Sequence, residues 1–361
     1  MVASKGWESV VSELSQSERT FIERMPKAEL HVHLEGAVRP ATLLELGRLH
    51  GVEYPFSDAA GAAEWFRFRD FPHFIEMFMA ILESLLTAED HGRVAWELAE
   101  DAQRENTRYL EVIISPSGLL NPRSVAHPDV VLAGCRRAAR RAMADFGVQM
   151  QFIVDAVRVR TTEDVMATVE WAVANQGDGL VGVNLGGTEV GYPASLHTAA
   201  IRHAKLHGLR ITLHAGETVG PESVWDALEV GAERISHGVR AIEDPALVAH
   251  LVERGIVLEV CPTSNVYLSV SPSIAEHPFR ALHDAGVLVT INSDDPPMFG
   301  CTLLSEYLTL AEQQGFTLDE LSEISLRAVR AAFLPDDEKA ALLASFEAEL
   351  AGLREELAVV G

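Results

Sequence analysis

The chain has 361 residues, of which 48% are apolar, and a formal net charge of −24. So acidic a surface would repel a phosphate backbone, which argues against nucleic acid as a partner. No apolar run approaches the ~20 residues of a membrane span and no basic, apolar leader opens the chain, so the sequence predicts no membrane association.

The cysteine pattern favours a reducing compartment. Cys135, Cys261 and Cys301 are odd in number and widely separated, and no CxxC pair occurs. This pattern argues against a disulfide framework and against a zinc site built from thiolates. We therefore predict a cytoplasmic protein and assign its cysteines no role.

The first segment to carry chemistry follows a polar helical lead-in, expected within residues 1–25. Residues 29–36 read ELHVHLEG. In an extended strand, alternate side chains share a face, so His31 and His33 point together while the apolar residues between them point the other way. Alone, a His-x-His motif is weak evidence for a metal site, because two histidines on a strand are more often structural or solvent-facing than ligands.

A long helical excursion, residues 52–106, separates this strand from the next. A helix is expected near 41–50, helical periodicity follows an aromatic stretch at 65–74 and runs to about residue 86, and a further helix runs from about 87 to 106. This is long for a simple βα connection, so we interpret 52–106 as a helical lid. For any single aromatic ring of the stretch, a place in the core is the better interpretation.

From there, strands and helices alternate. Apolar, β-branched runs predict strands at 109–114, 151–156, 180–185, 211–214, 234–236, 256–260 and 287–291. Amphipathic segments predict helices at 129–146, 161–176, 194–207, 221–230 and 243–253. With the first strand this makes eight βα units, which predicts an α/β fold, a (β/α)8 TIM barrel. No linker divides the chain, so 1–361 is expected to be one domain, with helices at 302–314, 318–332 and 336–356 packed outside the barrel.

Polar residues end several of the predicted strands. His31 and His33 end the first, His214 the fifth, His237 the sixth, and Asp294 the eighth. The carboxyl ends of barrel strands converge on one mouth. Imidazoles and a carboxylate suit zinc, with a position left for water, whose pKa the metal lowers toward about 7.

A carboxylate near such a metal is needed to move a proton. Glu217 lies three residues beyond His214 and past a glycine, so it can reach the same cavity. The alternative interpretation of Glu217 is an acid at a helix N-terminus, which is common. The neighbouring ligand favours the catalytic interpretation.

Four motifs together resemble the adenosine deaminase family of metal-dependent hydrolases. They are HVHLEG from His31, HAGE from His214, SHG around His237 and SDDP around Asp294, in this order over nearly the whole chain. The resemblance implies one zinc ion in a (β/α)8 barrel and hydrolytic removal of ammonia from C6 of a 6-aminopurine.

The resemblance also implies residue roles. The zinc ligands would be His31, His33, His214 and Asp294. Glu217 would protonate purine N1, and His237 would orient or deprotonate the zinc-bound water. The expected substrate contacts are His33, Asp295 at N7 and the backbone N–H of Gly187 at N3. The run 180–185 has no lysine to bridge a second metal, which supports one zinc, and the motifs of the nucleic-acid deaminases are absent.

The substrate is less determined. True adenosine deaminases usually carry Asp where this chain has Glu35, and that Asp contacts the ribose 5′-hydroxyl. The longer Glu35 is expected at the substrate, where it would intrude on the sugar site or meet a different 5′ substituent, which argues against plain adenosine. One branch of the family takes adenine, and another takes aminodeoxyfutalosine, a menaquinone-pathway nucleoside whose 5′ extension ends in a benzoate. Phe68, between Arg67 and Arg69, would suit an aromatic carboxylate. The alternative for these arginines, a solvated helix-end charge, has about even odds.

We therefore expect a 6-aminopurine nucleoside deaminase, with aminodeoxyfutalosine slightly ahead of adenosine and adenine behind. A catalytically silent zinc-binding barrel is the non-enzyme alternative. Such a protein would have no need for Glu217, His237 and Asp295 together. A metal hydrolase acting on another amine or amide also stays open.

Overall fold

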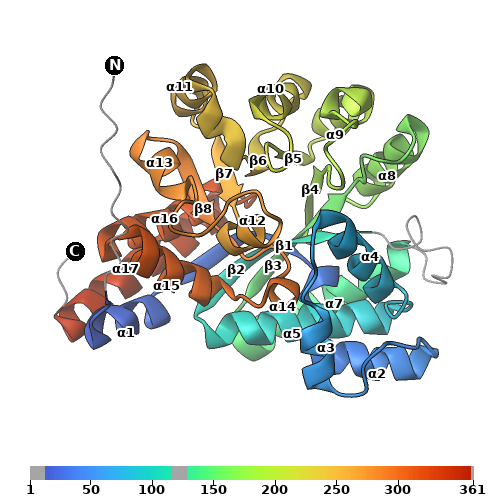
Figure 1. Cartoon of the computed structure of the whole chain (residues 1–361), viewed down its shortest axis with the longest axis horizontal. Helices are drawn as coiled ribbons and strands as arrows, with labels where there is room; N and C mark the ends of the chain where they lie inside the picture. The colour runs from blue at the N-terminus through green and yellow to red at the C-terminus, as the bar shows by residue number, and fades with distance from the viewer. Residues whose placement is uncertain (1–12, 116–127, 359–361) are drawn as a thin grey trace.

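The computed structural model describes residues 13–115 and 128–358. Its centre is an eight-stranded parallel sheet in the order β1-β2-β3-β4-β5-β6-β7-β8, surrounded by helices (Figure 1). The strands are β1 Lys27–His33, β2 Thr107–Ile114, β3 Gln149–Asp155, β4 Leu180–Asn184, β5 Arg210–Ala215, β6 Arg234–His237, β7 Val257–Val260 and β8 Leu288–Ile291. The predicted TIM barrel is confirmed.

Backbone hydrogen bonds between the end of β1 and the segment just after β8 close the ring. The N–H of His33 donates to the carbonyl of Asp294 at 2.8 Å, and the N–H of Asp294 donates to the carbonyl of His31 at 3.2 Å. The side chain of Asn292 adds a third bond, accepting from the N–H of Leu30 at 2.9 Å. We call this junction the closing seam.

Helices follow most strands, and several lie between β1 and β2. Before β5 the structure has α1 Gln16–Arg24, α2 Pro40–His50, α3 Ala59–Trp65, α4 Phe71–Leu82, α5 Ala88–Arg104, α7 Pro128–Phe146, α8 Thr162–Ala174 and α9 Thr198–Leu206. After β5 come α10 Pro221–Val230, α11 Pro245–Arg254, α12 Pro262–Tyr267, α13 Phe279–Asp284, α14 Pro296–Phe299, α15 Leu303–Gln314, α16 Leu318–Ala331 and α17 Asp336–Leu357. Short 3-10 turns occupy Glu35–Ala37, Ala194–His197 and Val239–Glu243. In the described ranges, no helix is long and apolar enough to cross a bilayer.

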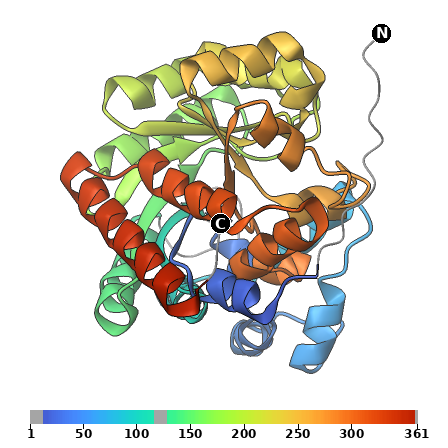
Figure 2. The ribbon, with the colours of Figure 1, turned by 90° about the vertical axis from the view of Figure 1, so that its left-hand side faces the viewer.

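The C-terminal helices cover one end of the barrel. Residues of α16 and α17 pack on Ala28 and Leu30, near the start of β1, and α1 packs against α15, α16 and α17. Figure 2 shows this group in front of the strands. The opposite end, where the strands finish, is left for the polar residues.

Periodicity located the strands within two residues, but it missed some short helices. It gave no separate helix for α3, α12 or α13, which have six or seven residues and so too few turns to show a period of 3.6. The helix expected to reach residue 86 ends at Leu82. The apolar pattern was misleading because Leu85, which follows the helix, is also buried. The range 194–207 divides into a 3-10 turn and α9.

Buried charges occupy the interior between the covered end and the mouth. Arg234 on β6 lies between two buried carboxylates, Glu111 of β2, with which it forms an ion pair, and Glu259 of β7, whose Oε1 is 2.6 Å from Arg234 Nε. The hydroxyl of Tyr109 donates to Glu111 at 2.7 Å. Each charge in this layer is therefore compensated by its neighbours.

We expect Arg234→Met to lower the free energy of unfolding by about 3–5 kcal/mol, because it leaves two buried carboxylates without their counter-charge. Chemical denaturation measures the loss. The matched control is Arg210→Met, since both guanidinium groups lie over the Phe333 ring, at 4.6 Å for Arg210 and 3.5 Å for Arg234. Arg210 pairs with the partly exposed Glu233, so its loss is expected to cost no more than about 1 kcal/mol. Equal losses in the two variants would contradict the argument.

Candidate metal centre and active site

Four predicted ligands meet at the carboxyl end of the barrel. His31 and His33 come from β1, His214 from β5, and Asp294 from the segment after β8. Asp294 Oδ1 is 3.2 Å from His31 Nε2 and 3.4 Å from His33 Nε2, and the four candidate ligand atoms lie within 4.8 Å of one another. All four residues are buried, and a set of three imidazoles and one carboxylate fits zinc.

Neighbouring side chains orient these candidate ligands. Glu259 Oε2 is 3.3 Å from His31 Nδ1, and Asn184 Oδ1 is 3.0 Å from His214 Nδ1. Because these partners engage Nδ1, the Nε2 atoms are turned toward the common centre, as is usual for metal-binding histidines. The hydroxyl of Ser264 donates to Asp294 Oδ2 at 2.7 Å.

The electrostatics of the cluster favour a cation. Burial opposes protonation of His31, but hydrogen bonds to Asp294 and Glu259 raise its pKa to about 10. Burial lowers the pKa of His33 to about 3 and that of His214 well below its usual value. Burial would raise the pKa of Asp294, but His31 and the other rings lower it. A metal ion would take the place of the proton held between His31 and Asp294, since ligands bind in deprotonated form.

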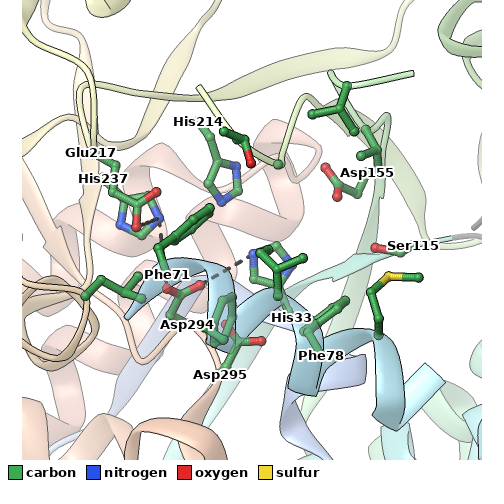
Figure 3. Close-up of a pocket in the computed structure, with 18 of the residues that line it drawn as sticks. His33, Phe71, Phe78, Ser115, Asp155, His214, Glu217, His237, Asp294 and Asp295 are labelled. Carbon is green, nitrogen blue, oxygen red and sulfur yellow. Dashed lines mark ion pairs between the residues drawn. The ribbon is translucent and has the colours of Figure 1, made fainter. Parts of the chain in front are cut away.

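Glu217 and His237 lie beside this cluster (Figure 3). Glu217 Oε1 is 3.8 Å from His237 Nε2, and that nitrogen is 3.9 Å from Asp294 Oδ2. Burial first, and then the Asp294 and Glu189 carboxylates, raise the pKa of Glu217 well above its usual value. Two neighbouring carboxyl groups whose pKa values are pushed apart can serve as acid and base.

Glu189 holds the segment that carries Glu217. Its carboxylate accepts backbone N–H bonds from Gly216, Glu217 and Thr218 at 2.9–3.0 Å and a hydroxyl bond from Ser223 at 2.6 Å. Sequence reasoning gave Glu189 no role. Its position five residues after β4 ends, on a loop at the barrel mouth, is the signal that could have found it.

Two site residues have unusual backbone conformations. His237 has φ 62° and Asp294 has φ 67°, in the left-handed region that costs a non-glycine residue free energy. Gly36 approaches the site so closely that an added Cβ would lie 1.6 Å from Asp295 Oδ1. The turns after β1, β6 and β8 are therefore held in place by the structure around them.

The cluster opens into a cavity of about 320 Å³. At one end lie His33, His214, Glu217, His237, Asp294 and Asp295. Apolar residues of α4 form a wall, which consists of Phe71, Phe74, Ile75, Phe78 and Met79. Asp155 and Ser115 lie on the other side of His33 from Glu217 and His237 (Figure 3). Asp155 is the last residue of β3, and Ser115 directly follows β2. The search for polar residues at strand ends could therefore have found both.

Three expected substrate contacts line the cavity and four do not. His33, Asp295 and Gly187, which has φ 89°, line it. Glu35 is buried outside the lining, accepts the N–H of Ser115 at 3.0 Å, and has its pKa raised by burial to about 8. The other three are away from the lining as well: Arg67 is 74% exposed and pairs with Glu64, Arg69 is exposed, and Phe68 packs on Phe74 and Phe299.

Comparisons with known proteins agree with the fold and with the resemblance to the adenosine deaminase family. A family model described as adenosine deaminase matches residues 26–348. The chain is 38% identical over 331 residues to aminodeoxyfutalosine deaminase of Streptomyces avermitilis, covering 91% of this chain and 92% of that protein. It is 39% identical over 319 residues to adenine deaminase of Agrobacterium fabrum, covering 88% and 97%. A zinc-bound amidohydrolase structure from Burkholderia ambifaria has a TM-score of 0.88 at 30% identity, covering 96% of each chain.

The metal centre can be tested with two adjacent aspartates. Asp294→Asn removes the one carboxylate of the cluster. Loss of a residue that only orients a ligand typically lowers metal affinity about 10–100-fold, and loss of the ligand itself should lower zinc affinity by more than this. Asp295→Asn, one residue on and outside the cluster, should keep zinc affinity near that of the unmodified protein. Zinc titration by calorimetry, with metal content measured on the same samples, checks both. Equal effects would rule out the proposed ligand set.

Proposed function

The chain belongs to the adenosine deaminase family, and we propose that it uses zinc to remove ammonia hydrolytically from C6 of a 6-aminopurine nucleoside. Family membership and its deaminase relatives make it a hydrolytic deaminase of aminopurine-type substrates. The observation that carries the zinc mechanism is the meeting of a His3Asp donor set with a buried Glu217, whose pKa burial raises, at one end of one cavity. When bound, zinc would make hydroxide available near neutral pH by lowering the pKa of water toward about 7.

Glu217 is suited to donate a proton to the purine ring. Its carboxyl lines the cavity, and burial raises its pKa well above the usual value, which favours the protonated form. Transfer of that proton to N1 would draw electron density from C6 and so make C6 open to attack. His237, next to Glu217, would orient the attacking oxygen.

Asp295 and Gly187 would hold the far side of the ring. Asp295 Oδ1 is buried and has no hydrogen-bond partner among the residues that the structure describes. Burial and the Asp294 carboxylate raise the pKa of Asp295 well above its usual value. A protonated carboxyl at that position can donate to N7. Gly187 would offer its backbone N–H to N3, and its conformation at φ 89° favours glycine.

Among substrates we place aminodeoxyfutalosine slightly ahead of adenosine. The relative from Streptomyces avermitilis supports it, as does the apolar wall of α4, on which an aromatic extension could pack. Among the described residues that line the cavity, Arg160 is the one Lys or Arg. It is better placed than Arg67 or Arg69 to pair with the benzoate carboxylate.

Free adenine is the alternative to a nucleoside substrate. The chain is as similar to the adenine deaminase of Agrobacterium fabrum as to the Streptomyces protein, so overall identity does not separate them. A silent zinc-binding barrel has less support, because Glu217, His237 and Asp295 all line the same cavity.

Glu217→Gln keeps the shape of the side chain but cannot donate the same proton. We expect turnover of any accepted aminopurine to fall about 10²–10⁴-fold, the usual contribution of a positioned acid, with zinc content unchanged. The matched control, Glu222→Gln in the first turn of α10, lies outside the cavity lining and should leave turnover unaltered. Near-normal turnover of the Glu217 variant with zinc bound would disprove its role as the acid.

Substrate choice is tested by measuring kcat/KM for aminodeoxyfutalosine, adenosine and adenine. Arg160→Met should reduce kcat/KM for aminodeoxyfutalosine alone, by about 10–100-fold, the effect of losing a hydrogen bond to a charged group. Arg69→Met serves as control, since that residue lies outside the cavity lining. A selective loss in the Arg69 variant would instead support the lid arginines. A clear preference of the unmodified protein for adenine would reject the nucleoside assignment.

A further inference from the structure

A chain of side-chain hydrogen bonds runs behind His237 and ends at a backbone N–H. The N–H of Phe279 donates to His277 Nδ1 at 3.1 Å. His277 Nε2 is 3.1 Å from Asn265 Oδ1, and Asn265 Nδ2 is 3.3 Å from His237 Nδ1. All three side chains are buried, at 3% exposure or less, so water does not compete for these groups.

The backbone fixes the direction of the chain. A peptide N–H can only donate, so His277 Nδ1 must carry a lone pair, and the ring proton must then be on Nε2. His277 therefore donates to Asn265 Oδ1, which turns the amide NH2 toward His237. The reverse direction would place a protonated Nδ1 of His277 against the N–H of Phe279, two donors facing each other.

The same logic sets the state of His237. Its Nδ1 accepts from Asn265, so the proton of the neutral ring is on Nε2, the nitrogen that faces Glu217 and Asp294 at 3.8 and 3.9 Å. A ring in this state can donate a hydrogen bond into the site but has no lone pair there to take a proton.

We propose that Asn265 and His277 are positioning residues that fix His237 as a hydrogen-bond donor toward the attacking oxygen and prevent it from acting as the base. This inference deepens the proposed function and rests on it. The proton that the attacking water loses then has to pass to a carboxylate, and Asp294 Oδ2 lies 3.9 Å from the same Nε2.

The hydrogen-bond chain from Phe279 through His277 and Asn265 to His237, called the relay from here on, lies beside the candidate metal ligands. Asn265 lies on α12, directly after Ser264, which donates to Asp294 Oδ2. The backbone carbonyl of Asn265 accepts N–H bonds from Val270 at 2.8 Å and Ser271 at 3.0 Å. The same short helix therefore orients Asp294 and His237 together.

Asn265→Asp is the most direct test, because it reverses the last step of the relay. One carboxylate oxygen can still accept from His277, but the other requires a donor and so favours a proton on His237 Nδ1. We expect kcat to fall about 10²–10⁴-fold, within the range for a positioned acid–base group, with KM little changed. In the serine-protease triad, a wrong imidazole tautomer costs about 10⁴-fold.

Nitrogen-15 NMR of the histidine rings gives a readout independent of turnover. In the unmodified protein, with and without zinc, we expect His237 to be protonated at Nε2 and bare at Nδ1. The Asn265→Asp variant should be protonated at Nδ1. The signals are assigned by their loss in a His237→Gln variant. Protonation of His237 at Nδ1 in the unmodified protein would overturn the proposal.

Two changes at His277 separate the relay from simple packing. His277→Gln keeps an acceptor and a donor in one side chain and should restore most of the kcat that His277→Leu loses. His203→Leu, on α9, controls for the loss of a histidine elsewhere. Equal kcat losses for Gln and Leu at 277 would overturn the relay. If His277→Leu does not fold, the NMR comparison still decides. Absence of turnover on every aminopurine would refute the proposed function but leave the tautomer measurement valid.

Discussion

The closing seam of the barrel is the constraint on which the site depends. The backbone groups that join β1 to the segment after β8 belong to His31, His33 and Asp294, whose side chains are also three of the four candidate ligands. Completing the sheet therefore brings the donors together. Because the main-chain N–H and carbonyl of Asp294 both take part in the seam, the free energy that closes the barrel also holds Asp294 in its left-handed conformation.

Charge compensation runs from the barrel interior to the site. Glu111 and Glu259 flank Arg234, and the second oxygen of Glu259 reaches His31. Burial would raise the pKa of Glu259, but Arg234 and His31 lower it to about 2. Glu259, the carboxylate that orients His31, is therefore kept ionised by the buried Arg234 beside it. The same electrostatic network contributes to the stability of the barrel and orients a ligand of the candidate metal centre.

The sequence predicted the elements that show a regular apolar period and the polar residues at the ends of strands. The eight strands followed from apolar runs, and the polar residues that end them include the candidate ligands, which the family resemblance then singled out. Residues of the loops were harder to place. The interpretation of Arg67 and Arg69 rested on composition alone, and nothing in a stretch of interleaved Phe and Arg tells which way a side chain points. The relay through Asn265 and His277 depends on hydrogen-bond direction, which only coordinates supply.

The two ends of the cavity are built from different parts of the chain. The metal end comes from strand ends and the closing seam, which tolerate little change, because a shift there moves a ligand. The substrate end comes from α4 and the segment after β3 that carries Arg160. Substitutions there change the contacts to a substrate without disturbing the donors. Relatives of nearly equal identity to this chain, 38% and 39%, carry the names of deaminases for different aminopurines. Specificity should therefore be sought in α4 and around Arg160.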